Sequence, residues 1–134
     1  MTTWHPWRHA RHHHERIPIT VTHLPDGYDG AWTTQGIFLS KHLGQAGRRC
    51  TLTHELVHVE RGPAIHGIPA IEERIVDEIT ARRLITLCAL RDALRWCGGI
   101  PGAECAEELW VDQATLDTRV ATLTAAERAW LHAA

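Results

Sequence analysis

Residues 52–63 read LTHELVHVERGP, an apolar helical stretch that contains the metal-binding pattern HExxH. Side chains four positions apart share one helix face, about 5–6 Å apart at Cβ, so His54 and His58 can direct nitrogen atoms at one metal ion. Glu55 lies one position further round the helix, where it can act on a water at the metal without occupying a coordination position. A Gly-Pro pair follows the motif and ends the helix. The pattern predicts a zinc site with Glu55 as general base.

A catalytic zinc ion usually has three protein ligands and an open fourth position, so a third ligand is needed. The metzincin pattern HExxHxxGxxH would place glycine and histidine where this chain has Arg61 and Ala64. That class also needs a downstream methionine, and the only methionine is Met1. These departures exclude the metzincin class. His66 is a further possible ligand, although its spacing from the motif fits no known pattern of zinc ligands.

A second class of site takes its third ligand, a glutamate, from a following helix, and residues 71–84 (IEERIVDEITARRL) have the apolar spacing of such a helix. Glu73 and Asp77 lie one turn apart on one face. In this Glu-x-x-x-Asp arrangement the glutamate binds zinc and the aspartate hydrogen-bonds a ligand histidine. Glu78 has the thermolysin-like spacing and is the alternative ligand. Acids can also simply solvate a helix face and pair with arginines, and this interpretation is favoured for Glu72 and Glu78.

These residues resemble the ImmA/IrrE metallopeptidases, and small actinobacterial and phage members are the most similar in character. The family pairs HExxH with a helix of the form E-x-x-A-[DN]-x-x-A, followed by a helix-turn-helix-like segment. The resemblance rests on HELVH, on the helix that contains Glu73 and Asp77, and on AEELWV at 106–111, and it covers residues 36 to about 124. Val76 and Thr80 stand where the family has alanine.

The resemblance implies a zincin-like gluzincin fold in which Glu73 is the metal ligand and Asp77 its partner. It also implies a protein substrate, a helix-turn-helix repressor-like transcription factor whose cleavage relieves repression in a mobile-element or stress-response switch. A catalytically silent regulatory protein that keeps this fold and acts by binding its partner is the alternative function. Retention of both histidines and of Glu55 favours the zinc endopeptidase, with one Zn²⁺ per chain.

The chain has 134 residues with 44% hydrophobic content, enough for one hydrophobic core. We expect an α+β fold with a short N-terminal β-sheet, the HExxH helix and a second ligand helix. Residues 1–16 are rich in His and Arg and are expected to form a mobile arm. Residues 17–97 would form the zincin-like core, and residues 98–134 a helix-turn-helix-like segment packed on it. Strands are expected near 17–24, 31–34 and 36–40, and helices near 46–61, 70–85 and 86–97.

One of these strands, residues 36–40 (GIFLS), is the candidate for the edge of the sheet beside the active site. An extended substrate can add to such an edge as another strand, here along Ile37, Phe38 and Leu39. The reaction also needs a donor that stabilises the tetrahedral oxyanion. His23, Tyr28 and His66 are candidates from loops.

The C-terminal segment carries the wrong charge for a DNA-binding module. Residues 103–134 contain six acidic residues and two arginines, whereas a DNA-binding unit presents a basic face. We therefore expect no direct nucleic-acid partner and interpret the segment as structural packing or a docking surface for substrate.

The remaining sequence features concern the cellular location. No apolar run approaches the roughly 18 to 20 residues of a membrane span, and the His-rich start lacks the apolar core of a signal peptide. A cytoplasmic protein without membrane contact is expected. The four cysteines form no Cys-x-x-Cys pair, so reduced thiols are expected and a structural zinc ribbon is not.

Overall fold

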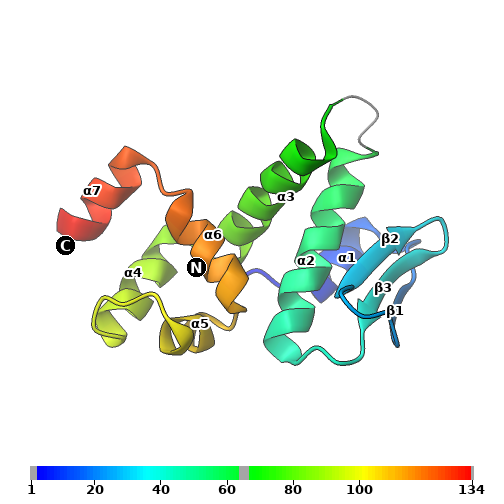
Figure 1. Cartoon of the computed structure of the whole chain (residues 1–134), viewed down its shortest axis with the longest axis horizontal. Coiled ribbons are helices and arrows are strands. Elements are labelled where there is room, and N and C mark those ends of the chain that lie inside the picture. Colours follow the sequence, from blue (N-terminus) through cyan, green and yellow to red (C-terminus); the bar gives the residue numbers. More distant parts are fainter. Residues whose placement is uncertain (1–2, 64–66, 134) are drawn as a thin grey trace.

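The computed structural model describes residues 3–63 and 67–133. These residues form an α+β fold with one three-stranded sheet and seven helices (Figure 1). The elements in chain order are α1 (Pro6–His13), β1 (Ile19–Thr22), β2 (Gly30–Thr33), β3 (Gly36–Ser40), α2 (Gln45–Arg61), α3 (Pro69–Leu84), α4 (Leu87–Trp96), α5 (Ala103–Leu109), α6 (Gln113–Ala121) and α7 (Ala125–Ala133).

The predicted α+β class, the three strands and the three helices from 46 to 97 are confirmed. No helix in the described ranges combines the length and apolar character that crossing a membrane requires.

The sheet has the order β1-β3-β2, with β1 parallel and β2 antiparallel to β3. The prediction that Ile37, Phe38 and Leu39 form an edge strand is therefore wrong, because β3 has a partner on both sides. Ile37 and Leu39 are completely buried, as the continuous apolar run of this strand requires once it is central. The edges of the sheet are β1 and β2.

β2 lies close against α2, and a glycine allows this approach. A Cβ atom at Gly30 would lie 2.5 Å from Cγ2 of Thr51 and 3.3 Å from Oε1 of Glu55, both on α2. The short connection from β2 to β3 also depends on a glycine, since Gly36 has φ +125° and any Cβ there would collide with the carbonyl oxygen of Pro18. The sheet edge formed by β2 is thus placed beside the helix that carries HExxH.

The N-terminal segment is not the mobile arm that its composition predicts. Residues 6–13 form α1, which begins with Pro6 at its first turn and packs against α2 with Ala10 buried. Before this helix, the indole N–H of Trp4 donates to the hydroxyl of Thr53, at 2.8 Å. The burial of Ala10 and hydrogen bonds from Trp4 and His9 to α2 hold the segment in place, although His and Arg dominate its composition.

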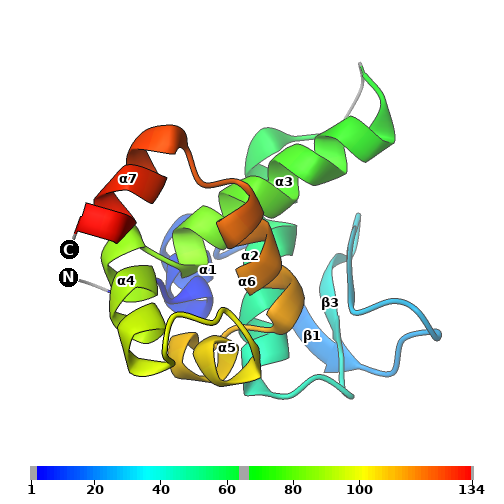
Figure 2. The same cartoon turned by 60° about the vertical axis from the view of Figure 1, so that its left-hand side comes forward.

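α2 contributes to two groups of buried side chains. Leu52 and Leu56 pack with Ala10 and the sheet residues Ile37 and Leu39. Cys50 instead belongs to a larger group, which comprises Leu84, Ile85, Leu90, Ala93, Cys105, Ala106, Val111 and Leu116. Figures 1 and 2 show α4, α5, α6 and α7 gathered on the side of α2 that faces away from the sheet. By its packing, α4 belongs with these C-terminal helices, so the helical unit starts before residue 98.

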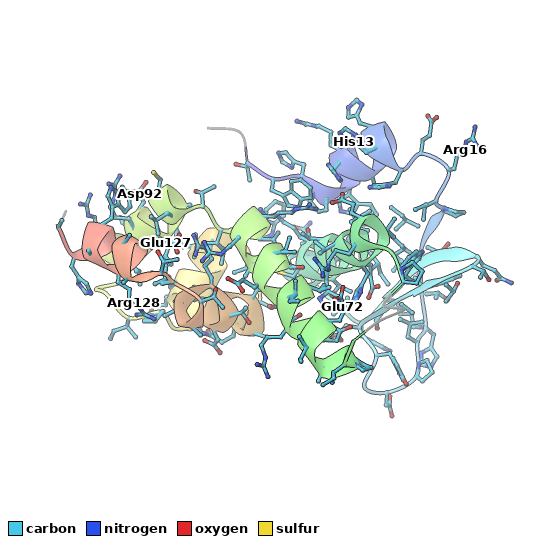
Figure 3. The ribbon with its side chains drawn as sticks, turned by 90° about the horizontal axis from the view of Figure 1, so that it is seen from above. His13, Arg16, Glu72, Asp92, Glu127 and Arg128 are labelled. Carbon is cyan, nitrogen blue, oxygen red and sulfur yellow. The ribbon has the colours of Figure 1, made fainter. Side chains whose placement is uncertain are left out.

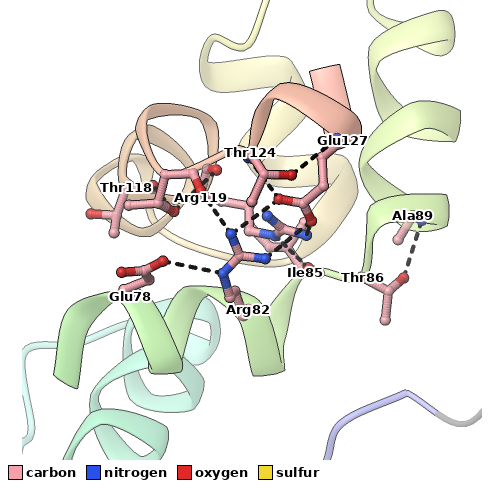
Figure 4. A network of polar contacts seen from close by, with 10 residues as sticks. Glu78, Arg82, Ile85, Thr86, Ala89, Thr118, Arg119, Thr124 and Glu127 are labelled. Carbon is pink, nitrogen blue, oxygen red and sulfur yellow. Dashed lines mark hydrogen bonds and ion pairs between the residues drawn. The ribbon is translucent and has the colours of Figure 1, made fainter. Parts of the chain in front are cut away.

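A partly buried ionic network fixes α3 to α6 and α7 (Figure 4). The Glu127 carboxylate accepts hydrogen bonds from Nη1 and Nη2 of Arg82, both at 3.0 Å, and from Nη2 of Arg119 at 3.4 Å. Arg119 is 3% exposed, and its Nε donates to the carbonyl of Ile85 at 2.8 Å. Arg82 and Arg119 therefore hold the end of α3, the predicted ligand helix, in a defined position relative to the C-terminal helices.

This network makes the stability of the fold sensitive to acid. Hydrogen bonds from Arg82 lower the pKa of Glu127 to about 2, so its stabilising contribution is complete above pH 4.5 and is lost as the pH falls toward 2. We expect Glu127→Gln to lower the free energy of unfolding at pH 7 by about 1 kcal/mol and to flatten its decline below pH 4.5. Urea unfolding of chelator-treated protein at several pH values measures both effects. Glu107→Gln, at an exposed position on α5, is the control and should change neither.

Candidate metal centre

His54 and His58 lie one turn apart on α2, on the side of the helix that is only partly covered. Their side chains are 24% and 21% exposed, whereas Leu52, Leu56 and Val57 on the other side are buried. The two rings meet edge to face, with 4.8 Å between centroids and 3.2 Å between the Nε2 atoms. The same nitrogen of each ring therefore points to one place.

Glu73 on α3 completes this group. Its Oε1 lies 2.8 Å from Nε2 of His58, and its Oε2 lies 3.2 Å from Nε2 of His54. Ligand atoms of a tetrahedral zinc ion at about 2.0–2.1 Å from the metal are about 3.3 Å apart. The separations in this group are close to that value, and one ligand atom from each of the three residues falls within 4.8 Å of the others. The group can hold a metal ion.

Asp77 lies behind the first of these histidines. Asp77 follows Glu73 by one turn of α3, and its Oδ1 is 3.1 Å from Nδ1 of His54. A hydrogen bond to Nδ1 fixes the tautomer and orientation of the ring, so that Nε2 is left with its lone pair facing the site. The structure thus brings together four of the five residues that the sequence places in the site through the HExxH and Glu-x-x-x-Asp patterns, and Glu55 is the fifth.

Glu55 is the buried carboxylate of the site, at 8% exposure. Burial raises its pKa, while the charges of His54 and His58 act in the opposite direction. A carboxylate in such surroundings takes up a proton more readily than one in water. Gly30 has no side chain, and this leaves space for the Glu55 carboxylate. The Glu55 side chain thus lies between the candidate ligand histidines and the edge strand β2.

The other acids of α3 turn away from this group. Glu78, the alternative ligand, pairs with Arg82 through a 3.4 Å contact between its Oε1 and Nε. Glu72 accepts two hydrogen bonds from Arg61, at 2.6 and 3.0 Å. Each position along a helix turns the side chain by about 100°, so the residues next to Glu73 and Asp77 face different neighbours. Both acids thus pair with arginines, as the sequence predicts.

An open cleft of about 330 Å³ runs beside the candidate ligands. Its lining includes Tyr28 and Gly30, from the loop before β2 and the start of that strand, and His54, Glu55 and Asp77. α6 also lines the cleft, through residues such as Thr115 and Thr118. The sequence offers the C-terminal segment as a docking surface but does not predict that α6 borders this site, because nothing local in residues 113–121 points to a cleft.

His23, Tyr28 and His66 are the loop residues that the sequence offers as oxyanion donors. Tyr28 lines the cleft and is 62% exposed. The ring of His23 packs edge to face on that of His42, at 5.9 Å between centroids. His66 lies outside the described residues. Of the candidate oxyanion donors, the structure therefore places Tyr28 in the cleft.

Cys50 also borders the cleft, but its thiol faces the core. It is 3% exposed, and its sulfur accepts the backbone N–H of Asp112 at 3.4 Å. Burial raises the pKa of this thiol, so it stays protonated and is a poor metal ligand. All four cysteines are free thiols, as the sequence predicts.

No family model, curated protein or solved structure matches the chain. Within the described ranges, two groups of histidine and glutamate side chains could hold a metal ion: the group at His54, His58 and Glu73, and a group on the other side of α2.

Proposed function

We propose that this protein is a zinc-dependent endopeptidase with a zincin-like fold. The observation that carries the proposal is the meeting of His54, His58 and Glu73 at one point, with the buried Glu55 carboxylate beside them. Two imidazoles and a carboxylate from two helices are the ligand set of a catalytic zinc site with an open fourth position. A structural site would instead close all four positions with protein ligands.

The residues of the site then have separate tasks. His54, His58 and Glu73 would hold the ion, and Asp77 keeps the His54 ring oriented. Zinc, when bound, supplies a Lewis acid that polarises the peptide carbonyl and lowers the pKa of water. Glu55 takes the proton of the attacking water and passes it to the amine that leaves, so the carboxylate is regenerated in each cycle.

The edge strand β2 supplies a means of positioning an extended peptide. It pairs with β3 on one side only, and Gly30 at its start lines the cleft. A substrate that adds to this edge as a further strand would place its backbone along the cleft, next to Glu55. We propose a protein substrate, and by the family resemblance a repressor-like transcription factor, whose flexible segment enters between β2 and α6.

Metal removal tests the proposal. We expect the zinc-loaded protein to cleave members of a proteome-derived peptide library, and cleavage to stop after treatment with 1,10-phenanthroline and to return with added zinc. Mass spectrometry of the digested library measures cleavage. Cleavage that continues in the metal-free protein would contradict the mechanism. An intact library after incubation with the zinc-loaded protein would support the alternative, a regulatory protein that acts by binding.

A further inference from the structure

The second group of potential ligands lies where α1 meets the end of α2, outside the catalytic cleft. Nε2 of His9 is 2.6 Å from Oε1 of Glu60, and Nε2 of His14 is 3.2 Å from the same oxygen. One ligand atom from each residue lies within 4.8 Å of the others. Two imidazole nitrogens and one carboxylate oxygen thus meet at a single point, as they do in the candidate catalytic site.

Charge neutralisation alone does not account for this arrangement. The other oxygen of Glu60 already accepts a hydrogen bond from Nη2 of Arg83, at 2.6 Å, so this carboxylate has a permanent cationic partner. This leaves Oε1 of Glu60 directed at the two imidazoles.

The surroundings hold these side chains in place. The ring of His9 lies 4.6 Å from the rings of Trp4 and His13, measured between centroids. The guanidinium of Arg83 lies over the Trp4 ring at 5.2 Å, and the indole of Trp4 is itself hydrogen-bonded to α2. The side chains of His9, His14 and Glu60 are only 21%, 17% and 25% exposed. Ligands held by packing lose less conformational freedom on binding a metal than mobile surface histidines do.

We propose that His9, His14 and Glu60 form a second divalent-metal site, with a ligand set that zinc can occupy, which fastens α1 to the C-terminal end of α2. Two imidazoles and a carboxylate suit zinc, and Arg83 would orient the ligand carboxylate through its second oxygen. Both histidines bind metal as neutral imidazoles, so the ion takes the place of any Nε2 proton directed at Glu60. His13 lies at the outer surface of α1 and is not one of the ligands (Figure 3).

The site has a structural consequence for the catalytic helix. Glu60 lies two residues after His58 on α2, so an ion at this point links the N-terminal helix to the helix that carries HExxH. A metal that binds the folded chain and not the unfolded chain stabilises the fold by mass action. Occupancy should therefore raise the melting temperature of the protein independently of the catalytic site.

Zinc titration of the full chain tests the proposal. In the double variant His54→Ala/His58→Ala, which lacks the catalytic ligands, we expect one zinc ion per chain by competition with a chromogenic chelator. Adding His14→Gln should remove it, because glutamine can still donate a hydrogen bond to Glu60 but is a poor zinc ligand. His12→Ala, at an exposed position of the same helix, is the matched control and should keep the ion.

A second substitution separates this site from nonspecific binding by surface histidines. Glu60→Gln preserves the size of the side chain and should weaken zinc binding in the double variant at least tenfold. Affinity unchanged by Glu60→Gln would overturn the proposal and point to histidine pairs such as His9 and His13 along α1. Absence of zinc binding in the double variant would also overturn it. Neither result bears on the catalytic site, which is assayed separately by cleavage.

Discussion

Replacing Glu55 by glutamine is expected to lower the rate of peptide cleavage by about 10²- to 10⁴-fold, the usual contribution of a general acid-base group. Glutamine has the same size but cannot accept the proton of the attacking water. The proposed metal ligands are His54, His58 and Glu73, so zinc should remain bound. Initial rates on a peptide cleaved by the wild type, together with zinc content by mass spectrometry, give both quantities.

The same variant separates the two functions that the sequence leaves open. Glu72→Gln is the control, since this acid pairs with Arg61 near the site and does not face the histidines. A regulatory protein that only binds its partner would keep its full effect on that partner after Glu55→Gln. An endopeptidase would lose the effect and still bind. Full regulatory activity in the variant would therefore contradict the protease mechanism.

The parts of the site that the sequence predicts are those set by local geometry. The separation of His54 and His58 follows from the helical repeat alone, and the buried face of α2 follows from the apolar residues between them. The same repeat places Glu73 and Asp77 on one face of α3. Contact between the two helices is not local, and the sequence predicts it from the need for a third metal ligand and from the Glu-x-x-x-Asp spacing, with which the family resemblance agrees.

The parts that the sequence does not predict depend on contacts between distant residues. α1 is held by Trp4, which bonds Thr53, and by His9, which bonds Glu60, about fifty positions further along the chain. The central position of β3 depends on the pairing of β1 with β3, which a run of apolar residues cannot specify. The wall that α6 contributes to the cleft depends on Arg82 and its partners, because they fix α3 relative to the C-terminal helices.

Removing the third ligand is expected to have the second large effect. Glu73→Ala should weaken zinc binding at the catalytic site by more than about 100-fold, beyond the roughly 10- to 100-fold loss expected for Asp77→Ala, which removes only the orienting hydrogen bond. Glu78→Ala should leave the affinity unchanged, because this side chain faces Arg82. Competition with a chelator of known zinc affinity, in a His14→Gln background, restricts the measurement to the catalytic site.

The order of these three effects distinguishes the geometry of α3 from its charge. If the acids of α3 attracted zinc only through their summed charge, each substitution would weaken binding to a similar extent, since each removes one negative charge. The direction in which each side chain leaves the helix predicts a different loss of zinc affinity: large for Glu73, intermediate for Asp77 and negligible for Glu78. If Glu78→Ala weakens zinc binding more than Glu73→Ala does, the third ligand is Glu78, at the thermolysin-like spacing. Because five positions separate these residues, α3 would then have to turn by about 140° in the metal-bound state.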